Sequence, residues 1–224
     1  GFEAFFGDPA GARFFSAPGR TELGGNHTDH NHGRVVAGAI NLDIVGMARP
    51  NGTDVIRLKS VEYDRMDEVD IGDLAINPED YGSRSLIRGI CARCKELGYA
   101  VGGFDCYTKT RVLKGSGLSS SAAFEILVVT VVSCLFNNGG IDPVAAAMIA
   151  QYAENVYFGK PCGLLDQMAA SVGGVTAMDF HDPAKPAIEK RELDLGAYGY
   201  ALCVVDTGGN HADLTDEYAA IPAE

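Results

Sequence analysis

The sequence predicts a mixed α+β (two-layer α/β) fold, and the order of its segments is the main reason. Strand-like segments dominate up to residue 113, and three helical segments then follow one another. Strands and helices therefore do not alternate as they would in repeated βαβ units. No internal repeat or low-complexity tract interrupts this order. At 224 residues the chain is long enough to bury a substantial core.

The first expected elements are two strands joined by a tight turn. Residues 34–48 are apolar, and residues 54–60 alternate between apolar and polar side chains. The residues between them, 50–53, read Pro-Asn-Gly-Thr and are typical of a hairpin turn. We therefore expect these two strands to pair. Residues 64–77 are acidic and patchy, which favours an excursion on the surface.

Capping residues mark the later elements. Gly98 is typical of the C-cap of an amphipathic helix. Asp142 followed by Pro143 is typical of an N-cap and a first helical position. Residues 124–137 are apolar on nearly every face, which predicts a buried helix. The other expected elements are strands at 103–113 and 200–206 and helices at 85–97, 142–158 and 163–171.

The composition is that of a globular protein, with 46% hydrophobic and 21% charged residues. A formal net charge of −12 argues against nonspecific binding to nucleic acid or to anionic membranes. No apolar stretch reaches the roughly 18 residues of a membrane span, and residues 1–3 do not resemble the start of a signal sequence. We expect a cytoplasmic monomer that binds small molecules, with no nucleic-acid partner and no membrane partner.

The cysteines lie mostly among apolar neighbours, which is typical of reduced, buried thiols rather than of a disulfide framework. Cys91 and Cys94 match the C-x-x-C pattern, but no second pair or histidine stands at zinc-finger spacing. Both lie in a predicted helix, so the structural interpretation is favoured over a metal site. The six cysteines are Cys91, Cys94, Cys106, Cys134, Cys162 and Cys203.

Residues 114–123, Lys-Gly-Ser-Gly-Leu-Ser-Ser-Ser-Ala-Ala, form a glycine- and serine-rich loop directly before the apolar helix. Glycines let the backbone approach a ligand, and the first turn of a helix offers unpaired N–H groups, so this segment predicts a phosphate-binding loop. A flexible linker is the alternative. The Walker A pattern is excluded because Lys114 precedes the glycines, and the Rossmann fingerprint fails at Ser120.

Residues 18–32 contain a second dense group of polar side chains. Three histidines and one aspartate within six residues suggest a metal site. Carboxylate, amide and imidazole groups in a glycine-rich turn equally suit a polyhydroxylated ligand such as a sugar. A solvated polar loop is the third interpretation. The polar residues are Glu22, Asn26, His27, Thr28, Asp29, His30, Asn31 and His32.

Asp166 is the third candidate, because it is an acidic residue in the otherwise apolar segment 164–170. Such a setting predicts a perturbed carboxyl group or a nearby cation. Glu154 and Lys160 precede it and add further charge to this region. Alternatively, Asp166 is the N-cap of the next helix.

These three segments together resemble the GHMP small-molecule kinases, and within them most closely the galactokinases. The resemblance covers nearly the whole chain in the order of the family's motifs. The segments that carry it are Gly-Arg-Thr-Glu-Leu-Gly-Gly-Asn-His-Thr-Asp-His-Asn-His-Gly at 19–33, the loop at 115–121, Ala-Glu at 153–154, Gly-Lys-Pro-Cys-Gly at 159–163, Asp-Gln at 166–167 and Asp-Glu-Tyr at 216–218.

The resemblance implies ATP-dependent phosphorylation of the anomeric hydroxyl of galactose to galactose 1-phosphate, with Mg²⁺. Asp166 matches the family's catalytic aspartate, which accepts or orients the hydroxyl proton, and Arg20 matches the arginine that stabilises charge. The implied sugar-binding residues are Asn26, His27, Thr28, Asp29 and Tyr218. The implied ATP-binding residues are Gly115, Ser116, Gly117, Leu118, Ser119, Ser120 and Ser121, and the implied Mg²⁺ ligands are Ser121 and Glu154.

The chain departs from the family's usual residues mainly in the sugar signature. Asn26 stands where the family has Glu, which removes a charged acceptor and adds a donor. Sugar preference is therefore the property that these departures affect. The others are Glu22 for Asn, Gly24 for Ile, His30 for Tyr and, before the glycine loop, Leu113 for Pro.

The resemblance also implies two domains with the active site in the cleft between them. Residues 1–198 would be the N-terminal domain, and residues 199–224 the truncated start of a C-terminal domain. We expect residues 1–224 alone to phosphorylate poorly, because an exposed cleft admits water. The rival functions are a kinase for N-acetylgalactosamine or arabinose and a sugar- and ATP-binding sensor. A metallohydrolase built on His27, His30 and His32 is the third.

Overall fold

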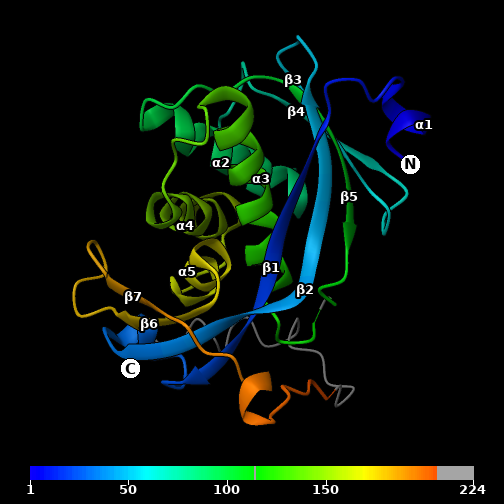
Figure 1. Cartoon of the computed structure of the whole chain (residues 1–224). Coiled ribbons are helices and arrows are strands. Elements are labelled where there is room, and N and C mark those ends of the chain that lie inside the picture. Colours follow the sequence, from blue (N-terminus) through cyan, green and yellow to red (C-terminus); the bar gives the residue numbers. More distant parts are fainter. Residues whose placement is uncertain (114, 206–224) are drawn as a thin grey trace.

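The computed structural model describes residues 1–113 and 115–205. These residues form a seven-stranded sheet with helices α2 to α5 gathered on one face, whereas the short helix α1 lies on the other (Figure 1). The predicted mixed α+β fold is confirmed, and no described helix is long and apolar enough to cross a membrane. The strands are β1 (Arg13–Gly24), β2 (Arg34–Pro50), β3 (Val55–Ser60), β4 (Met66–Asp70), β5 (Phe104–Thr110), β6 (Val175–Asp179) and β7 (Ala187–Arg191). The helices are α1 (Phe2–Phe6), α2 (Ser83–Glu96), α3 (Ser120–Phe136), α4 (Pro143–Tyr152) and α5 (Leu165–Val172), with 3₁₀ turns η1 (Thr28–Asn31) and η3 (Gly196–Tyr198) and a π-helical turn η2 (Ala153–Phe158).

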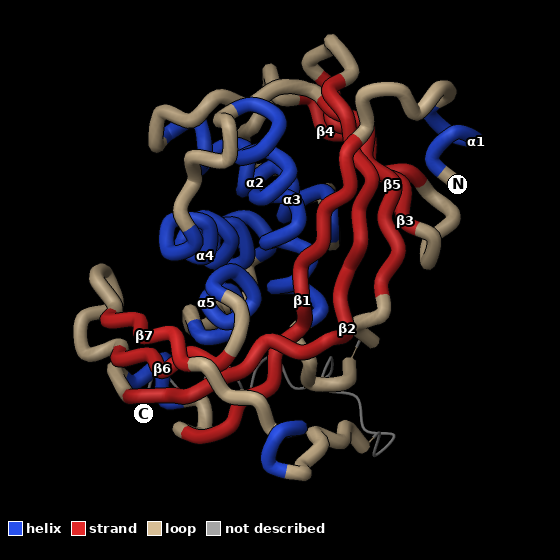
Figure 2. The backbone as a smooth tube through the Cα atoms, in the orientation of Figure 1, coloured by secondary structure: helices blue, strands red, loops and turns tan. Residues whose placement is uncertain are grey.

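Strand β2 is the spine of the sheet, because β1, β5 and β6 all pair antiparallel with it. β6 pairs with residues 34–38 and β5 with residues 44–50, and the strand bends between these two parts (Figure 2). The register of β1 against β2 shifts between Pro18 and Arg20. Such irregularities re-aim a side chain, and this one lies at the arginine that the sequence singled out.

The predicted hairpin between residues 34–48 and 54–60 is wrong. β5 lies between β2 and β3, pairing parallel with β3, and the antiparallel partner of β3 is β4. The turn itself is held open by Asn51, whose Nδ2 donates to Val55 O at 2.9 Å and to Asp105 Oδ1 at 3.0 Å. Asp105 belongs to β5, so this hydrogen bond ties the turn to the strand that lies between β2 and β3. The expected surface excursion at 64–77 contains β4.

The helix predictions are confirmed within a few residues. α3 is buried on nearly every face, and Ala123, Leu127 and Val132 have no exposed surface. Asp142 caps α4 by accepting hydrogen bonds from Val144 N at 3.0 Å and Ala145 N at 3.2 Å. The predicted helix to residue 158 exists, but its last part is the π-helical turn η2.

Helix α5 is anchored to the bent end of the sheet by a small apolar cluster. Leu165 and Met168 of α5 pack there with Val35 of β2, Met178 of β6 and Phe180. This cluster fixes the helix that carries Asp166.

The predicted buried strand at 200–206 is wrong for the residues described. Residues 199–205 form no strand, and Tyr200 and Val205 are 70% and 78% exposed. An apolar segment becomes a strand only where a sheet edge accepts its hydrogen bonds, and the described part of this segment has no such pairing. Asp206 lies outside the described residues.

Candidate active site

Strand β1, the glycine loop and helix α5 meet at one corner of the molecule. Arg20 N donates to Leu118 O at 3.1 Å, which joins the edge of β1 to the loop. Gly19 allows this approach, because a Cβ atom at this position would lie 2.8 Å from the same carbonyl oxygen. The Arg20 side chain then reaches along the loop, and its Nη1 donates to Gly117 O at 2.7 Å.

Asp166 has partners for both of its carboxylate oxygens. Arg20 Nε and Nη2 lie 2.7 and 2.6 Å from Oδ1, and Ser119 Oγ donates to Oδ2 at 2.5 Å. The Arg20 side chain is 8% exposed, whereas that of Asp166 is 31% exposed. A ligand can therefore reach the carboxylate while the cation beside it stays buried. Asp166 lies in the first turn of α5 and Leu164 is the N-cap, so the alternative that Asp166 is itself the N-cap is wrong.

The glycine loop is a shaped turn and not a flexible linker. Its backbone is left-handed at Gly115, Gly117 and Ser119, with φ values of 76°, 73° and 58°. Ser119 is the N-cap of α3, but its hydroxyl bonds Asp166 and so leaves the first turn of the helix without a side-chain cap. The first N–H groups of α3 are thus free for an anion.

Two buried carboxylates, Glu125 and Glu154, share one amide group behind this corner. Gln167 Nε2 donates to Glu125 Oε2 at 3.1 Å and to Glu154 Oε2 at 2.8 Å. Burial and the neighbouring charge of Glu154 raise the pKa of Glu125 well above its usual value. Burial disfavours the ammonium form of Lys160, but its ion pair with Glu154 at 3.3 Å outweighs this and raises the pKa of Lys160.

The donors in this network fit a magnesium ion. Ser121 and Glu125 are four residues apart on α3, so both lie on the helix face toward Gln167 and Glu154. Glu125 Oε1 is buried and has no hydrogen-bond partner. A hydroxyl and a carboxylate are ligands that Mg²⁺ takes alongside phosphate and water.

The sugar-signature turn, residues 25–33, joins β1 to β2. Its backbone is left-handed at Gly25, Asn26 and His27. Asparagine adopts this conformation more readily than most residues, which is a physical reason for Asn26 where the family has Glu. The turn is tied back to β1 because His27 N donates to Glu22 Oε1 at 2.9 Å. Asn26 itself is exposed.

Asp29 links this turn to the helix of Asp166. Its Oδ2 accepts a hydrogen bond from Leu165 N at 3.0 Å, and its side chain is only 2% exposed. Gly163 makes room for the contact, since a Cβ atom there would lie 1.9 Å from Asp29 Oδ2. The Oδ1 atom of Asp29 has no hydrogen-bond partner. Thr28 is partly buried, and its Oγ1 lies 3.4 Å from Arg34 O.

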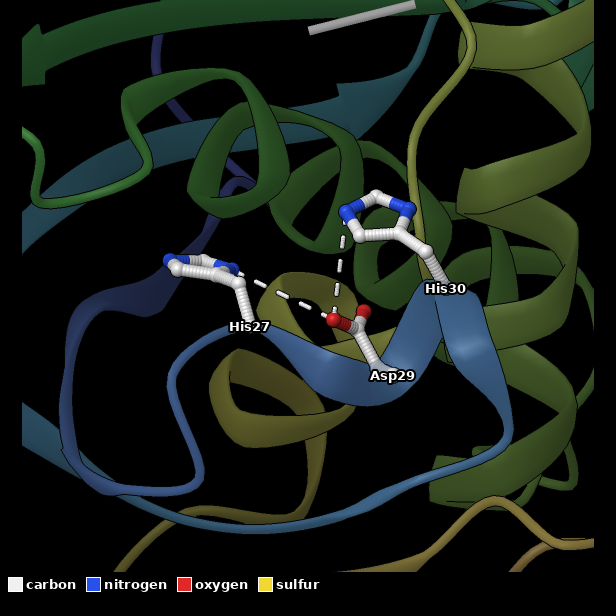
Figure 3. Close-up of side chains that lie close together, drawn as sticks. All are labelled: His27, Asp29 and His30. Atoms are coloured by element: carbon white, nitrogen blue, oxygen red, sulfur yellow. Dashed lines mark ion pairs between the residues drawn. The ribbon is translucent and has the colours of Figure 1, made fainter. Parts of the chain in front are cut away.

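Two histidines of the turn, His27 and His30, lie beside Asp29 (Figure 3). His27 Nδ1 lies 4.0 Å and His30 Nε2 3.9 Å from Asp29 Oδ1. Of the three histidines and one aspartate that suggested a metal site, His27, Asp29 and His30 lie together. His32 lies apart from them, with its Nδ1 3.3 Å from the backbone oxygen of His181, so the rival site built on His27, His30 and His32 does not form.

The structure thus brings together Arg20, the glycine loop, Asp166 and, through Leu165, Asp29. Tyr218 lies outside the described residues. The sequence interpretation missed Glu125, whose signal was a single acidic residue inside an apolar helix. It also missed the bond from Ser119 to Asp166, which joins residues far apart in the chain and leaves no local pattern.

Cys162 contacts the network behind the site, because Gln167 Nε2 lies 3.6 Å from Cys162 Sγ. All six cysteines are free thiols. Burial raises the pKa of Cys94 and of Cys106 to about 12, and raises that of Cys91 further. Cys91 and Cys94 belong to no group of three potential metal ligands among the described residues, which favours the structural interpretation of the C-x-x-C pair. Cys203 is exposed, which differs from the expected burial.

Two hollows on the described surface lie away from this corner. One, of about 430 Å³, is lined by residues that include Arg49 and Asp105, and the other, of about 450 Å³, by residues that include Arg34. Neither includes Arg20 or Asp166, so the converging side chains, and not these hollows, define the candidate site.

Comparison with known families agrees with this geometry. Residues 1–50 match the family described as the galactokinase galactose-binding signature, and residues 85–174 match the GHMP kinases N terminal domain. The first match contains Arg20 and Asp29, and the second contains the glycine loop and Asp166. Two separate segments of the chain thus match models of the galactokinase signature and of the GHMP kinases.

Among curated proteins, the chain is similar to galactokinases. It is 31% identical over 215 residues to the galactokinase of Clostridium tetani and 33% identical over 220 residues to that of Streptomyces coelicolor. Each alignment covers 96% of this chain, but 54% and 55% of the relative. The chain thus spans about half the length of the curated relatives it matches.

Solved structures of kinases are also similar to this chain. A crystal structure of Lactococcus lactis galactokinase complexed with galactose has a TM-score of 0.78 and 30% identity, and the match covers 86% of this chain and 50% of that chain. The Methanococcus jannaschii mevalonate kinase has a TM-score of 0.70 at 18% identity, covering 94% of this chain and 67% of that one. The second likeness supports the fold alone.

Proposed function

We propose that this chain carries the N-terminal part of an ATP- and Mg²⁺-dependent sugar kinase that phosphorylates the anomeric hydroxyl of galactose. One observation carries the proposal: Asp166 is held between Arg20 and the glycine loop, next to the sugar-signature turn. Residues 1–198 would form the N-terminal domain, and residues 199–224 would begin the next one.

In this proposal Asp166 Oδ2 keeps its hydrogen bond from Ser119 and accepts a second one from the sugar's anomeric hydroxyl. The hydroxyl oxygen forms the new P–O bond, the bond to ADP breaks, and the hydroxyl proton passes to Asp166. Arg20 balances the charge of the carboxylate and of the transferring group. Asp29 Oδ1, which lacks a partner, accepts a sugar hydroxyl. Phosphoryl transfer depends chiefly on such positioning and charge neutralisation.

The N–H groups at the start of α3 would bind the phosphates of ATP. Mg²⁺, when bound, would neutralise charge on the β- and γ-phosphates, and Ser121 and Glu154 are the residues that would hold it. Gln167 and Lys160 would keep the Glu154 carboxylate in one orientation. Glu125 Oε1, which has no hydrogen-bond partner, lies behind this site.

The direct test is release of ADP by the purified full-length protein with a panel of sugars, repeated with Asp166→Ala. We expect turnover with galactose that the substitution abolishes. Turnover that prefers N-acetylgalactosamine or arabinose would correct the substrate. Tight sugar binding without turnover by the unsubstituted protein would instead support the sensor, and hydrolysis that needs zinc but not ATP would refute the kinase.

A further inference from the structure

We propose that His27, Asp29 and His30 form a binding site for Zn²⁺ or a similar transition-metal ion. Each residue presents one ligand atom, and these atoms all lie within 4.8 Å of one another (Figure 3). A tetrahedral zinc ion with bonds of about 2.0–2.2 Å separates its ligand atoms by about 3.4 Å. Side-chain rotations that close the gaps by roughly one ångström would therefore complete the site.

The buried carboxylate at the centre gives the first evidence that a ligand belongs here. The Asp29 side chain is 2% exposed, and its Oδ1 has no hydrogen-bond partner. A buried oxygen without a partner is costly. Its other oxygen is committed to Leu165 N at 3.0 Å, so the carboxylate cannot turn away from the histidines.

Glu22 gives the second, independent evidence. His27 has Nδ1 directed to Asp29 Oδ1 at 4.0 Å and Nε2 directed to Glu22 Oε2 at 3.6 Å. A carboxylate hydrogen-bonded to the far nitrogen of a metal-binding histidine fixes the tautomer and makes the near nitrogen a better ligand. The 3.6 Å separation is longer than such a bond, so Glu22 would take this role after a small rotation of the His27 ring. Glu22 itself is held in place, since its Oε1 accepts a hydrogen bond from His27 N.

The donor set selects the kind of metal. Two imidazole nitrogens and one carboxylate oxygen suit Zn²⁺ and its neighbours, whereas Mg²⁺ and Ca²⁺ prefer oxygen ligands. The side chains of His27 and His30 are 45% and 18% exposed, so an ion can enter from solvent. The site is thus separate in chemistry from the Mg²⁺ position proposed at Ser121 and Glu154.

Two of the four residues are departures from the usual sugar signature. The family commonly has Asn at the position of Glu22 and Tyr at that of His30, so the usual pattern has only His27 and Asp29. In this chain the ligand His30 and the outer partner Glu22 both occur. The metal site is therefore a property of this sequence.

Metal and sugar would compete at this turn if the proposed sugar kinase activity is correct. His27 and Asp29 would serve both the sugar and the metal ion, so the two ligands exclude each other. Zn²⁺ would raise the apparent KM for the sugar and leave kcat unchanged at saturating sugar.

The test is direct titration of the purified protein with Zn²⁺ by calorimetry and with Co²⁺ by visible absorption, without sugar or nucleotide. We expect one Zn²⁺ per chain and a tetrahedral Co²⁺ spectrum. His30→Tyr should weaken binding by at least the roughly 10–100-fold that loss of an outer partner costs. His32→Ala is the matched control, because it removes a nearby histidine outside the cluster and should leave binding unchanged. Equal affinity in the His30→Tyr variant and the unsubstituted protein overturns the site.

Glu22→Gln keeps all three ligands and should weaken binding about tenfold, which preserves the test if His30→Tyr does not fold. Circular dichroism on each variant reports folding. Sugar-dependent turnover without Zn²⁺ binding overturns the metal site and leaves the kinase proposal standing. Zn²⁺ binding by a full-length protein that shows no sugar-dependent turnover refutes the kinase and leaves the metal site.

Discussion

Asp166 and Asp29 are neighbours in space but differ in how their oxygens are satisfied. Asp166 has Arg20 on one oxygen and Ser119 on the other. Asp29 uses one oxygen to hold Leu165 N, the residue directly before Asp166, and leaves the other buried and free. Both carboxylate oxygens of Asp166 therefore have hydrogen-bond partners, whereas only one oxygen of Asp29 does.

The difference separates parts of the site that are built in advance from parts that wait for a ligand. A preformed arrangement stabilises a transition state without reorganisation at the moment of reaction. An unpaired buried oxygen costs stability until a ligand arrives and so favours binding. Glu125, with its own free buried oxygen, belongs to the second kind.

The largest effect should come from Asp166→Asn. Asparagine keeps the size of the side chain but cannot accept the hydroxyl proton, so sugar-dependent release of ADP should fall by about 10²–10⁴-fold. Thermal melting should show that the variant is folded. Turnover within about tenfold of that of the unsubstituted protein would mean that Asp166 only positions the sugar. Asp166 and Asp29 would then have the same role.

Gly163→Ala tests the position of the Asp29 carboxylate, which has a partner for only one of its oxygens. A Cβ atom would lie 1.9 Å from Asp29 Oδ2 and displace this carboxylate from Leu165 N. We expect the free energy of unfolding in urea to fall by about 1–3 kcal/mol and the KM for sugar to rise. Gly38→Ala is the matched control, because its Cβ would have its nearest atom at 3.7 Å and should change stability by less than about 0.5 kcal/mol. Equal results for both variants would show that Asp29 is held less tightly than its contacts indicate.

Glu125→Gln should stabilise the protein in a pH-dependent way. Burial and Glu154 raise the pKa of Glu125 above its ordinary 4.5, so the folded state binds more protons than the unfolded state above that pH. Stability of the unsubstituted protein therefore falls as the pH rises through this range, by at most about 1.4 kcal/mol per pH unit for one proton. The variant lacks this loss, and its advantage should vanish below about pH 4.5 in urea unfolding with a chelator present.

Asp43→Asn provides a control of opposite sign. Burial raises the pKa of Asp43, but hydrogen bonds from Ser16 and Arg111 outweigh this effect and lower it below the ordinary 3.8. The contribution of Asp43 is thus present above that pH and lost as the pH falls. The variant should be less stable than the unsubstituted protein at neutral pH and equal to it in acid. Parallel pH profiles for the two variants would contradict both assignments.

The smallest effect should distinguish Ser119→Gly from Ser119→Ala. Both lose the bond to Asp166, so both should lose about 3–10-fold in turnover. Only glycine is free of strain at φ 58°, so the glycine variant should be more stable by about 1 kcal/mol in urea unfolding. Two variants of equal stability would show that the left-handed turn is not strained.

Local signals in the sequence were sufficient for the helices. The Asp142 cap, the apolar stretch of α3 and the glycine after α2 each act within a few residues of the chain. The hairpin failed because its turn carries no information about β5, which enters some fifty residues later. The short strand β7 has a mostly exposed face rich in charge, so no apolar alternation indicates it.

The sequence predicted several residues of the candidate site, but not the hydrogen bonds that join them. Resemblance to a family pointed to Arg20 and Asp166, which lie 146 positions apart and meet only in the fold. The bond from Ser119 to Asp166 and the contact of Asp29 with Leu165 depend on tertiary packing. The sequence pointed to all three histidines and Asp29, but only the conformation of the 3₁₀ turn η1 decides that His32 lies outside the group.

The π-helical turn Ala153–Phe158 should tolerate substitutions more readily than insertions or deletions. A π-helical turn accommodates one more residue than an α-helical turn, and deleting one residue would rotate the chain after the turn by about 100°. The chain beyond it is fastened, because Cys162 N donates to Asn155 Oδ1 at 2.7 Å. Val156 and Phe158 are exposed and can vary. Homologous sequences should therefore align here with many substitutions but without gaps.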